Sequence, residues 1–410
     1  MPFTVVVAFL FLAFSVDANP VLITSSPVTL PISRHLNLSS IHNLVHHDQT
    51  RARYMKNNVE CSEPKLESHV VVNEPVTNSA VQYTASVGVG SPPTYYNLVI
   101  DTGSSNTWIG AGTEYVKTST SVETSDTVSV SYGSGSFSGN EYTDSVTLAS
   151  NLVVTKQSIG VAALSSGFED VDGILGIGPV DLTVGTLSPS IESGIPTVTD
   201  KLFSNGQISV HSIGISFEPT TVTSTVNGEI SWGGTDSSKY TGSIAYIPLT
   251  TSSPANLYWG INSSIRYGKS QTILSNTAGI VDTGTTLVLI ASDAFKKYKT
   301  ATGSAADSTT GLLKISSSQY AALSSLYLVT AKGTFELTPN AQIWPRSLNS
   351  EIGGSSSSIY LIVADLGHNS GQGLDFIAGM TFLERYYSVY DTANKRVGLA
   401  TTSYTTATSN

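Results

Sequence analysis

The chain has 410 residues, of which 40% are hydrophobic and only 12% are charged. This length and apolar content suffice for two globular units with buried cores, and they exclude a disordered chain. A net charge of −10 argues against nucleic-acid binding, which requires a basic surface. The single cysteine, Cys61, excludes an intramolecular disulfide and a cluster of thiolate metal ligands.

The first residues predict a targeting signal. The apolar run from Val5 to Phe14 is too short to span a bilayer, and Val16-Asp17-Ala18 offers small residues where a signal peptidase reads. We therefore predict a signal peptide at residues 1–18 and an exported protein without stable membrane insertion. A membrane anchor is the alternative, but nothing extends the apolar run toward the necessary length.

Residues 19–72 differ in composition from the rest and predict a propeptide. Five of the seven histidines lie here, and residues 34–56 carry four Arg or Lys against one Asp, whereas the chain from Val72 carries the full −10. Opposite charges would hold this segment on the body at neutral pH, and protonation in acid would release it. A merely solvated leader is the alternative. Because Cys61 lies here, the mature protein is predicted to contain no cysteine.

From Val81 onward the sequence alternates short strands with polar turns. Ser, Thr, Val and Gly are abundant and helix formers are sparse, which favours an all-β architecture. The strands expected in the first half are residues 81–89, 94–100, 127–132, 144–148 and 152–161.

Two similar loops stand out in this body. Ile100-Asp101-Thr102-Gly103-Ser104-Ser105 recurs as Val281-Asp282-Thr283-Gly284-Thr285-Thr286, each after an apolar strand. The glycine lets backbone amides approach the carboxylate, and the hydroxyls can donate to it. Such donors favour the ionised form, whereas a second carboxylate at the same place raises one pKa. The two loops together predict a pair of aspartates that shares one proton.

A second motif is also duplicated. Val171-Asp172-Gly173-Ile174-Leu175-Gly176 follows the first loop, and Phe376-Ile377-Ala378-Gly379 follows the second. One apolar-apolar-Gly element after each loop predicts two copies of one lobe. Pro248 and residues 250–253 interrupt the strands, so we place the lobes at residues 73–250 and 251–410.

These motifs resemble those of the pepsin family of aspartic proteases, and they are most similar to its cysteine-free branch secreted by basidiomycete fungi, the polyporopepsin type. The resemblance extends from about Val81 to Ala400. It implies a bilobal pepsin-like fold of two similar β-barrel-like lobes with a cleft between them. It also implies an aspartic endopeptidase that is made as a zymogen and inhibited by its own propeptide.

The resemblance assigns Asp101 and Asp282 as the catalytic pair. Peptide hydrolysis by two carboxylates uses water as the nucleophile and is expected at acidic pH, because one carboxyl must stay protonated. The resemblance implies that Thr102 and Thr283 lock the two loops together, and that the hydroxyls of Ser104 and Thr285 bond the outer carboxylate oxygens. With the two glycines, the residues that match the family's support of the pair are Thr102, Gly103, Ser104, Thr283, Gly284 and Thr285.

The stretch from Val130 to Ser136 resembles the family's flap, a hairpin that folds over bound peptide. Tyr132, Gly133 and Ser134 would contact the substrate, and Trp108 would back the flap tyrosine. The alternatives are an ordinary glycine-rich turn and a tryptophan that only fills the core. Extended peptides with apolar residues around the scissile bond are the expected substrates.

The sequence departs from the family at Met380, where an Asp often follows the second apolar-apolar-Gly. We expect this change to alter the pKa values of the catalytic pair. Asn37 and Asn262 begin Asn-x-Ser sequons and are candidate glycosylation sites.

The remaining expectations concern partners and rival functions. We expect a monomer with no cofactor, no metal and no nucleic-acid partner, secreted or alternatively vacuolar. The rivals are an inactive pseudo-enzyme or inhibitor on the same fold, a glycosidase, which also pairs carboxylates, and a carbohydrate-binding module.

Overall fold

The computed structural model describes residues 27–36, 44–57, 81–168, 170–190, 192 and 194–410. The predicted signal peptide, Asn37 and Cys61 lie outside these residues. Within them, no helix is both long and apolar enough to cross a membrane.

One large sheet runs through the molecule. It has fourteen strands in the described residues. In order across the sheet they are β12 (Thr241–Pro248), β24 (Arg396–Thr401), β23 (Tyr386–Asp391), β10 (Ser212–Ser216), β11 (Ser224–Trp232), β1 (Val28–Leu36), β2 (Val81–Val89), β3 (Thr94–Asp101), β8 (Gly173–Gly176), β4 (Thr107–Ile109), β7 (Leu152–Ser166), β6 (Ser136–Ala149), β5 (Val122–Ser131) and β9 (Leu187–Ser188).

The second half of the chain forms two smaller sheets. One has the order β19 (Thr334–Leu337), β18 (Leu326–Val329), β13 (Gly260–Tyr267), β14 (Gln271–Val281), β22 (Phe376–Ala378), β15 (Val288–Ile290) and β21 (Val363–Asp365). The other joins β16 (Ala305–Ala306), β17 (Leu313–Ile315) and β20 (Ile359–Leu361). The α-helices of the described residues are short, namely α1 (Leu44–Asn57), α2 (Val198–Ser204), α3 (Ser292–Thr302), α4 (Ser317–Ala321) and α5 (Met380–Leu383).

The duplicated motifs form the same arrangement twice. In the first half, β3 pairs in parallel with β8, and β8 pairs antiparallel with β4. In the second half, β14 pairs in parallel with β22, and β22 pairs antiparallel with β15. Each apolar-apolar-Gly element thus lies between the strand that leads into an aspartate loop and the strand that leaves it. The predicted all-β, bilobal architecture is confirmed.

Three strands of the first half are longer than their apolar runs indicated: β5 begins at Val122, β6 at Ser136, and β7 continues to Ser166. The first part of β6 is rich in Ser, Gly and Asn and alternates between exposed and buried positions. Its pairing with both β5 and β7 compensates for weak strand propensity.

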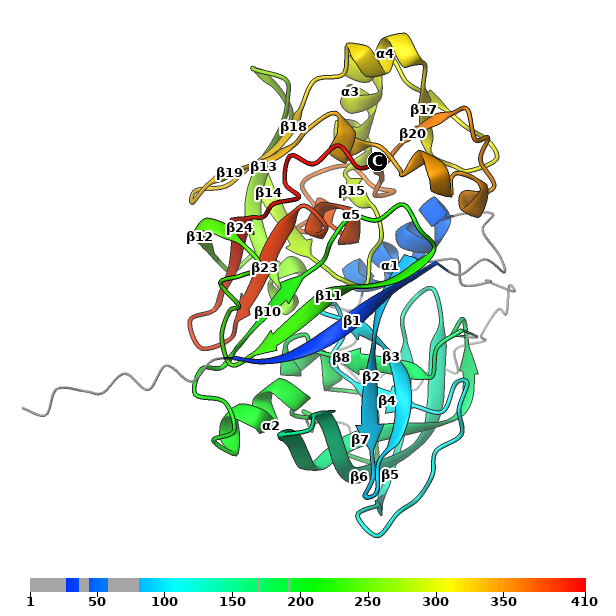
Figure 1. Cartoon of the computed structure of the whole chain (residues 1–410), viewed down its shortest axis with the longest axis vertical. Helices are drawn as coiled ribbons and strands as arrows, with labels where there is room; N and C mark the ends of the chain where they lie inside the picture. The colour runs from blue at the N-terminus through cyan, green and yellow to red at the C-terminus, as the bar shows by residue number, and fades with distance from the viewer. Residues whose placement is uncertain (1–26, 37–43, 58–80, 169, 191, 193) are drawn as a thin grey trace, which may run out of the picture.

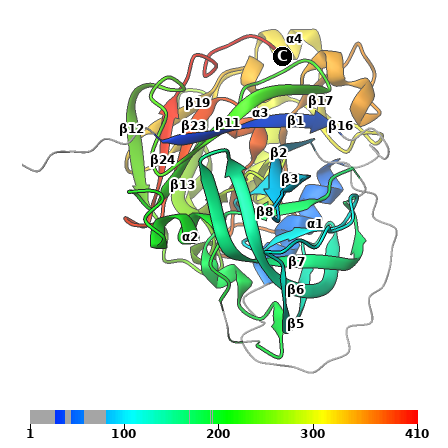
Figure 2. The same ribbon diagram turned by 60° about the horizontal axis from the view of Figure 1, so that its bottom comes forward.

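Two elements of the predicted propeptide are built into this body. β1 lies between β11 and β2 with antiparallel pairing on both sides, and Figures 1 and 2 agree on this position. α1 lies between the two halves of the molecule in Figure 1. The side chain of Arg34 on β1 is fully buried and its Nε lies 2.9 Å from Glu384 Oε1. The predicted propeptide therefore contributes both a sheet strand and a helix to the described structure.

Candidate active site

Asp101 and Asp282 lie at corresponding ends of two strands. Asp101 is the last residue of β3, and Asp282 directly follows β14. Their exposed fractions are 1% and 0%. The backbone N–H of Thr102 donates to the Thr283 hydroxyl at 3.0 Å, and the N–H of Thr283 donates to the Thr102 hydroxyl at 3.0 Å. These reciprocal bonds bring the two predicted loops together.

Each carboxylate receives the same pair of donors. The Gly103 N–H donates to Asp101 Oδ1 at 2.9 Å, and the Ser104 hydroxyl donates to Oδ2 at 2.6 Å. In the second loop, the N–H of Gly284 donates to Asp282 Oδ1 at 3.1 Å, and the hydroxyl of Thr285 donates to Oδ2 at 2.5 Å. Donors of this kind stabilise the ionised form of a buried carboxyl group.

The glycines of the two loops have no room for a side chain. A Cβ on Gly103 would lie 2.6 Å from Asp282 Oδ1, and a Cβ on Gly284 would lie 2.5 Å from Asp101 Oδ1. Each glycine therefore lies directly against the opposite aspartate, and any larger residue would separate the pair.

Arg51 of α1 connects both aspartates. Its Nη2 donates to Asp101 Oδ1 at 2.6 Å and to Asp282 Oδ1 at 3.3 Å, and its Nε donates to Asp282 Oδ2 at 3.1 Å. The residue Arg51 is only 5% exposed. Sequence reasoning counted Arg51 as one of several propeptide charges and missed this contact. The sequence signal that could have indicated this contact is a basic residue in a polar helical stretch of an otherwise acidic protein.

Burial and charge act on this group of three in opposite directions. Burial raises the pKa of Asp101, the Arg51 guanidinium lowers it, and the neighbouring Asp282 raises it, with a net upward direction. Burial alone would lower the pKa of Arg51, but the two carboxylates hold it above its usual value. The cation therefore stays charged, while Asp101 takes up a proton more readily than an ordinary aspartate does.

Other residues of α1 also contact the walls of this site. The Asp48 carboxylate is fully buried, and its Oδ2 accepts hydrogen bonds from the N–H groups of Thr286 at 3.1 Å and Leu287 at 2.8 Å. The hydroxyl of Tyr258 donates to the carbonyl oxygen of Met55 at 3.0 Å. The space left beside the dyad is about 30 Å³, room for a few water molecules but not for a peptide. The helix therefore fills the place between the two loops and their surroundings.

The predicted flap lies over the same helix. A Cβ on Gly133 would lie 2.6 Å from the carbonyl oxygen of Thr50 and 2.9 Å from Tyr54 Cβ, so the turn touches α1. Tyr132 is 3% exposed, and its ring centroid lies 6.5 Å from that of the fully buried Trp108. Both rings belong to one apolar cluster, and the neighbouring Ser134 is buried as well. The structure thus brings the predicted flap residues and Trp108 to one wall of the site.

Comparison with known proteins decides the family. Residues 82–402 match the family described as Eukaryotic aspartyl protease. The chain belongs to the pepsin-like aspartic proteases. It is therefore an aspartic endopeptidase of the hydrolase class.

Relatives of this pepsin-like protease come from fungi and animals. It is 68% identical to polyporopepsin from Irpex lacteus over 82% of this chain and 98% of that one. The embryonic pepsinogen of Gallus gallus is 30% identical over 93% of this chain and 97% of its own. The crystal structure of the aspartic proteinase from Irpex lacteus superposes with a TM-score of 0.79 and 69% identity, covering 80% of this chain and 96% of that one.

Two further predicted positions are placed by the structure. Met380 is fully buried at the start of α5, and its N–H donates to the Thr285 carbonyl oxygen at 2.7 Å, next to the second aspartate loop. Asn262 on β13 is exposed, and its side-chain oxygen accepts from the Thr250 hydroxyl at 2.9 Å. Whether Asn262 carries a glycan stays a prediction.

Among the described residues, no group of three or more His, Cys, Asp or Glu is arranged to hold a metal ion.

Proposed function

We propose that this pepsin-like protease is a secreted zymogen in which Asp101 and Asp282 activate water to hydrolyse peptide bonds at acidic pH. The observation that carries the proposal is the joint contact of both buried carboxylates with the single guanidinium of Arg51. Both carboxylates therefore face one nitrogen, Nη2, and carboxylates paired in this way can share one proton once the cation leaves. The matched donors to the two carboxylates support the same assignment.

In the proposed reaction the ionised member of the pair removes a proton from a water molecule held between the carboxyls. The protonated member donates to the oxygen of the scissile carbonyl, and a gem-diol forms. The gem-diol collapses to acid and amine when a proton reaches the leaving nitrogen. No covalent enzyme intermediate forms, because water and not a side chain attacks the carbon.

We propose that Tyr132, Gly133 and Ser134 cover an extended peptide with apolar residues around the scissile bond, and that Trp108 supports the tyrosine. In the described form α1 lies against this turn, so substrate and helix compete for one place. The propeptide is therefore an intramolecular inhibitor, in agreement with the similarity to a pepsinogen.

Acidification is the proposed release signal. The pKa of Asp101 is raised, mainly by burial, so this carboxyl is neutralised at a higher pH than an ordinary aspartate. Its protonation removes one partner of Arg51 and weakens the ion pair that holds α1.

We further propose a signal peptide at residues 1–18, a propeptide at 19–72, and lobes at 73–250 and 251–410. We also propose that the enzyme is monomeric and that it is secreted into the medium or, alternatively, located in the vacuole.

The experiment compares wild type with Asp282→Asn and with Asp170→Asn, which changes an exposed carboxylate in the same way. Each protein is brought to acidic pH, and hydrolysis of an apolar fluorogenic peptide is followed across pH 2 to 7. We expect cleavage by wild type and Asp170→Asn and a loss of at least about a thousandfold in Asp282→Asn. Equal cleavage by folded Asp282→Asn would exclude the proposed pair.

A further inference from the structure

A buried glutamate lies in the strands that carry the predicted flap turn. Glu141 is on β6, and the turn at residues 132–135 joins β5 to β6. Figure 2 shows β5, β6 and β7 side by side. Glu141 lies opposite Gly160 of β7 and opposite an irregular stretch of β5 between Glu123 and Thr127. Only 2% of Glu141 is exposed, and the proposed reaction does not use it.

The carboxyl group of Glu141 has a single hydrogen-bond donor. The Ser158 hydroxyl donates to Oε1 at 2.5 Å, and Oε2 is buried without a partner among the described residues. An ionised carboxylate has about four lone-pair sites, so most of its charge would be uncompensated here. When Glu141 is protonated, Oε1–H can donate to the oxygen of Ser158, and the unpaired Oε2 carries no charge. The surroundings therefore favour the neutral form.

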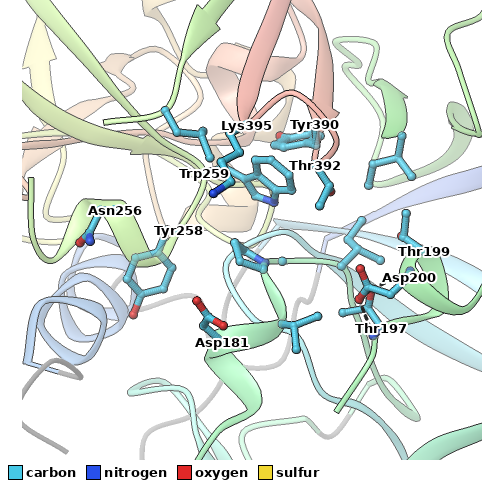
Figure 3. Close-up of a pocket in the computed structure, with 16 residues that line it drawn as sticks. Asp181, Thr197, Thr199, Asp200, Asn256, Tyr258, Trp259, Tyr390, Thr392 and Lys395 are labelled. Atoms are coloured by element: carbon cyan, nitrogen blue, oxygen red, sulfur yellow. Dashed lines mark hydrogen bonds between the residues drawn. The ribbon is translucent and has the colours of Figure 1, made fainter. Parts of the chain in front are cut away.

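Other carboxylates in this half of the chain are surrounded by donors. Asp144, also on β6, accepts four hydrogen bonds. Asp200 accepts from the N–H and the hydroxyl of Thr197, both at 2.7 Å, as Figure 3 shows, and its Oδ1 lies 2.8 Å from His211 Nε2. Burial raises the pKa of both aspartates, but the donors outweigh burial and lower it. Glu141 lacks this compensation.

The charges near Glu141 do not replace the missing donors. Burial raises the pKa of Glu141 most, the Ser158 hydroxyl opposes burial, the charge of Asp126 on β5 adds to it, and the result is about 7. None of the other charged or titratable side chains on β5, β6, β7 and α2, which packs against β7, contributes to this shift. They are Glu123, Tyr142, Asp144, Lys156, Asp200 and Lys201. No cation in the described strands therefore stabilises an ionised Glu141.

This arrangement makes the stability of the hairpin depend on pH. The pKa of Glu141 is about 7 in the folded hairpin, and it returns to about 4.3 when the strand opens to water. The folded form thus holds a proton that the open form releases, and the stabilisation is fully present below about pH 4.3. It is lost as pH rises through the folded pKa, with opening favoured by up to about tenfold more per pH unit between the two values.

We propose that Glu141 is a pH switch in the flap hairpin, which keeps β5 and β6 closed in acid and lets them open more readily as pH rises. The switch is separate from the aspartate pair, because Glu141 lies within β6 and bonds Ser158 of β7. The inference rests on the proposed function, since a flap acts only on a peptide bound beneath it. The turn is the free end of this hairpin, so opening of β6 would remove the cover that Tyr132 gives to the peptide.

The test measures hydrogen exchange of β6 by mass spectrometry in full-length Asp101→Asn from pH 5 to 7. This background prevents self-digestion and removes the titration of Asp101. After correction for intrinsic exchange rates, protection of residues 136–149 relative to residues 386–391 should fall about tenfold per pH unit. Glu141→Gln in the same background should show constant relative protection, because glutamine does not ionise. Glu123→Gln is the matched control, since Glu123 is an exposed glutamate of the same hairpin, and it should keep the pH dependence.

Ser158→Ala keeps the test open if Glu141→Gln fails to fold. It removes the donor that lowers the pKa of Glu141, so the fall in protection should continue to a higher pH than in the parent, followed to about pH 9. Constant protection in the parent, or an unchanged pH dependence in a folded Glu141→Gln or Ser158→Ala, would overturn the switch. The proposed function would stand in that case, because no peptide cleavage is measured. Failure of wild type to hydrolyse any peptide would instead overturn the proposed function and with it the flap role of the switch.

Discussion

Thr102 and Thr283 exchange hydrogen bonds across the molecule, each backbone N–H donating to the hydroxyl of the other at 3.0 Å. The Thr283 hydroxyl also donates to the Ile100 carbonyl oxygen at 2.9 Å. Both threonines are buried, so each loop supplies hydrogen-bond partners to buried polar groups of the other loop. This exchange fixes the distance between the two aspartates that precede the threonines.

Replacing Thr283 by Val should both destabilise the protein and impair catalysis. The substitution leaves the N–H of Thr102 and the carbonyl of Ile100 without these partners, at a cost of about 1–3 kcal/mol in the free energy of unfolding. Denaturant unfolding measures this cost, and we expect kcat to fall at least about tenfold as the pair loses its alignment. Thr300→Val, on the exposed surface of α3, is the control and should change stability by less than about 0.5 kcal/mol. Equal stability of the two variants would show that the exchange contributes nothing.

Gly103→Ala should inactivate the enzyme without unfolding it. The added methyl would lie 2.6 Å from Asp282 Oδ1, so the two carboxylates must move apart. A displacement near 1 Å reduces catalysis about a hundredfold, which steady-state kcat/KM would show. Gly234→Ala is the control, since its Cβ would meet only Pro27 at 3.8 Å. Full activity of Gly103→Ala would mean that the pair tolerates separation.

Arg51→Gln should reduce the latency of the zymogen. Without the cation, two buried carboxylates face each other, the helix loses its ion pairs, and the prosegment is released at higher pH than in wild type. We expect intact-mass analysis at pH 5 to 6 to show earlier loss of the prosegment. Arg53→Gln removes the same charge from an exposed position of α1 and should behave like wild type. Identical behaviour of the two variants would assign the effect to net charge instead of the dyad contact.

Asp144 should support stability in acid. Burial raises the pKa of this carboxyl, but donors from Thr120, Tyr115, Ser121 and the Ser145 N–H outweigh burial and lower it. A carboxyl whose folded pKa is lowered contributes stability that is fully present above its unfolded pKa of about 3.9. This contribution is lost as pH falls through the folded pKa, so Asp144 stays ionised at the mildly acidic pH proposed for the enzyme.

The corresponding variant is Asp144→Asn. We expect it to lower the free energy of unfolding by about 2 kcal/mol at pH 5, where the wild-type carboxylate accepts its four bonds. The difference from wild type should shrink below about pH 3 as the wild-type group is protonated. Thermal unfolding from pH 2 to 7 measures both. A difference that does not depend on pH would contradict the ionised role of Asp144.

Much of the fold and the dyad could be predicted because they depend on local patterns. The two loops at Asp101 and Asp282 carry their own strands, glycines and hydroxyls, and an apolar-apolar-Gly element follows each one. The contact of Arg51 with both aspartates could not be predicted, because it depends on how a distant helix packs between the lobes. The same holds for Arg34 and Glu384, a buried pair 2.9 Å apart whose two residues lie in distant parts of the chain.

The flap illustrates an intermediate case. Its glycine-rich turn was visible in the sequence, but the stacking of Trp108 and Phe137, with ring centroids 4.3 Å apart, required the paired strands to be known. The length of β6 was likewise set by its two neighbours and not by its own residues. Tertiary pairing therefore decided what local propensity left open.

Whether the aspartate pair drives both activation and catalysis can be measured by bringing full-length wild type and Asp101→Asn from pH 7 to about pH 4, near the range in which carboxyls titrate. Intact mass and casein hydrolysis are recorded together. We predict that wild type loses roughly its first 70 residues, the predicted signal and propeptide, and digests casein, while folded Asp101→Asn does neither. Casein hydrolysis by Asp101→Asn, or no cleavage by folded wild type at any value from pH 2 to 7, would show that Asp101 is not part of a catalytic pair.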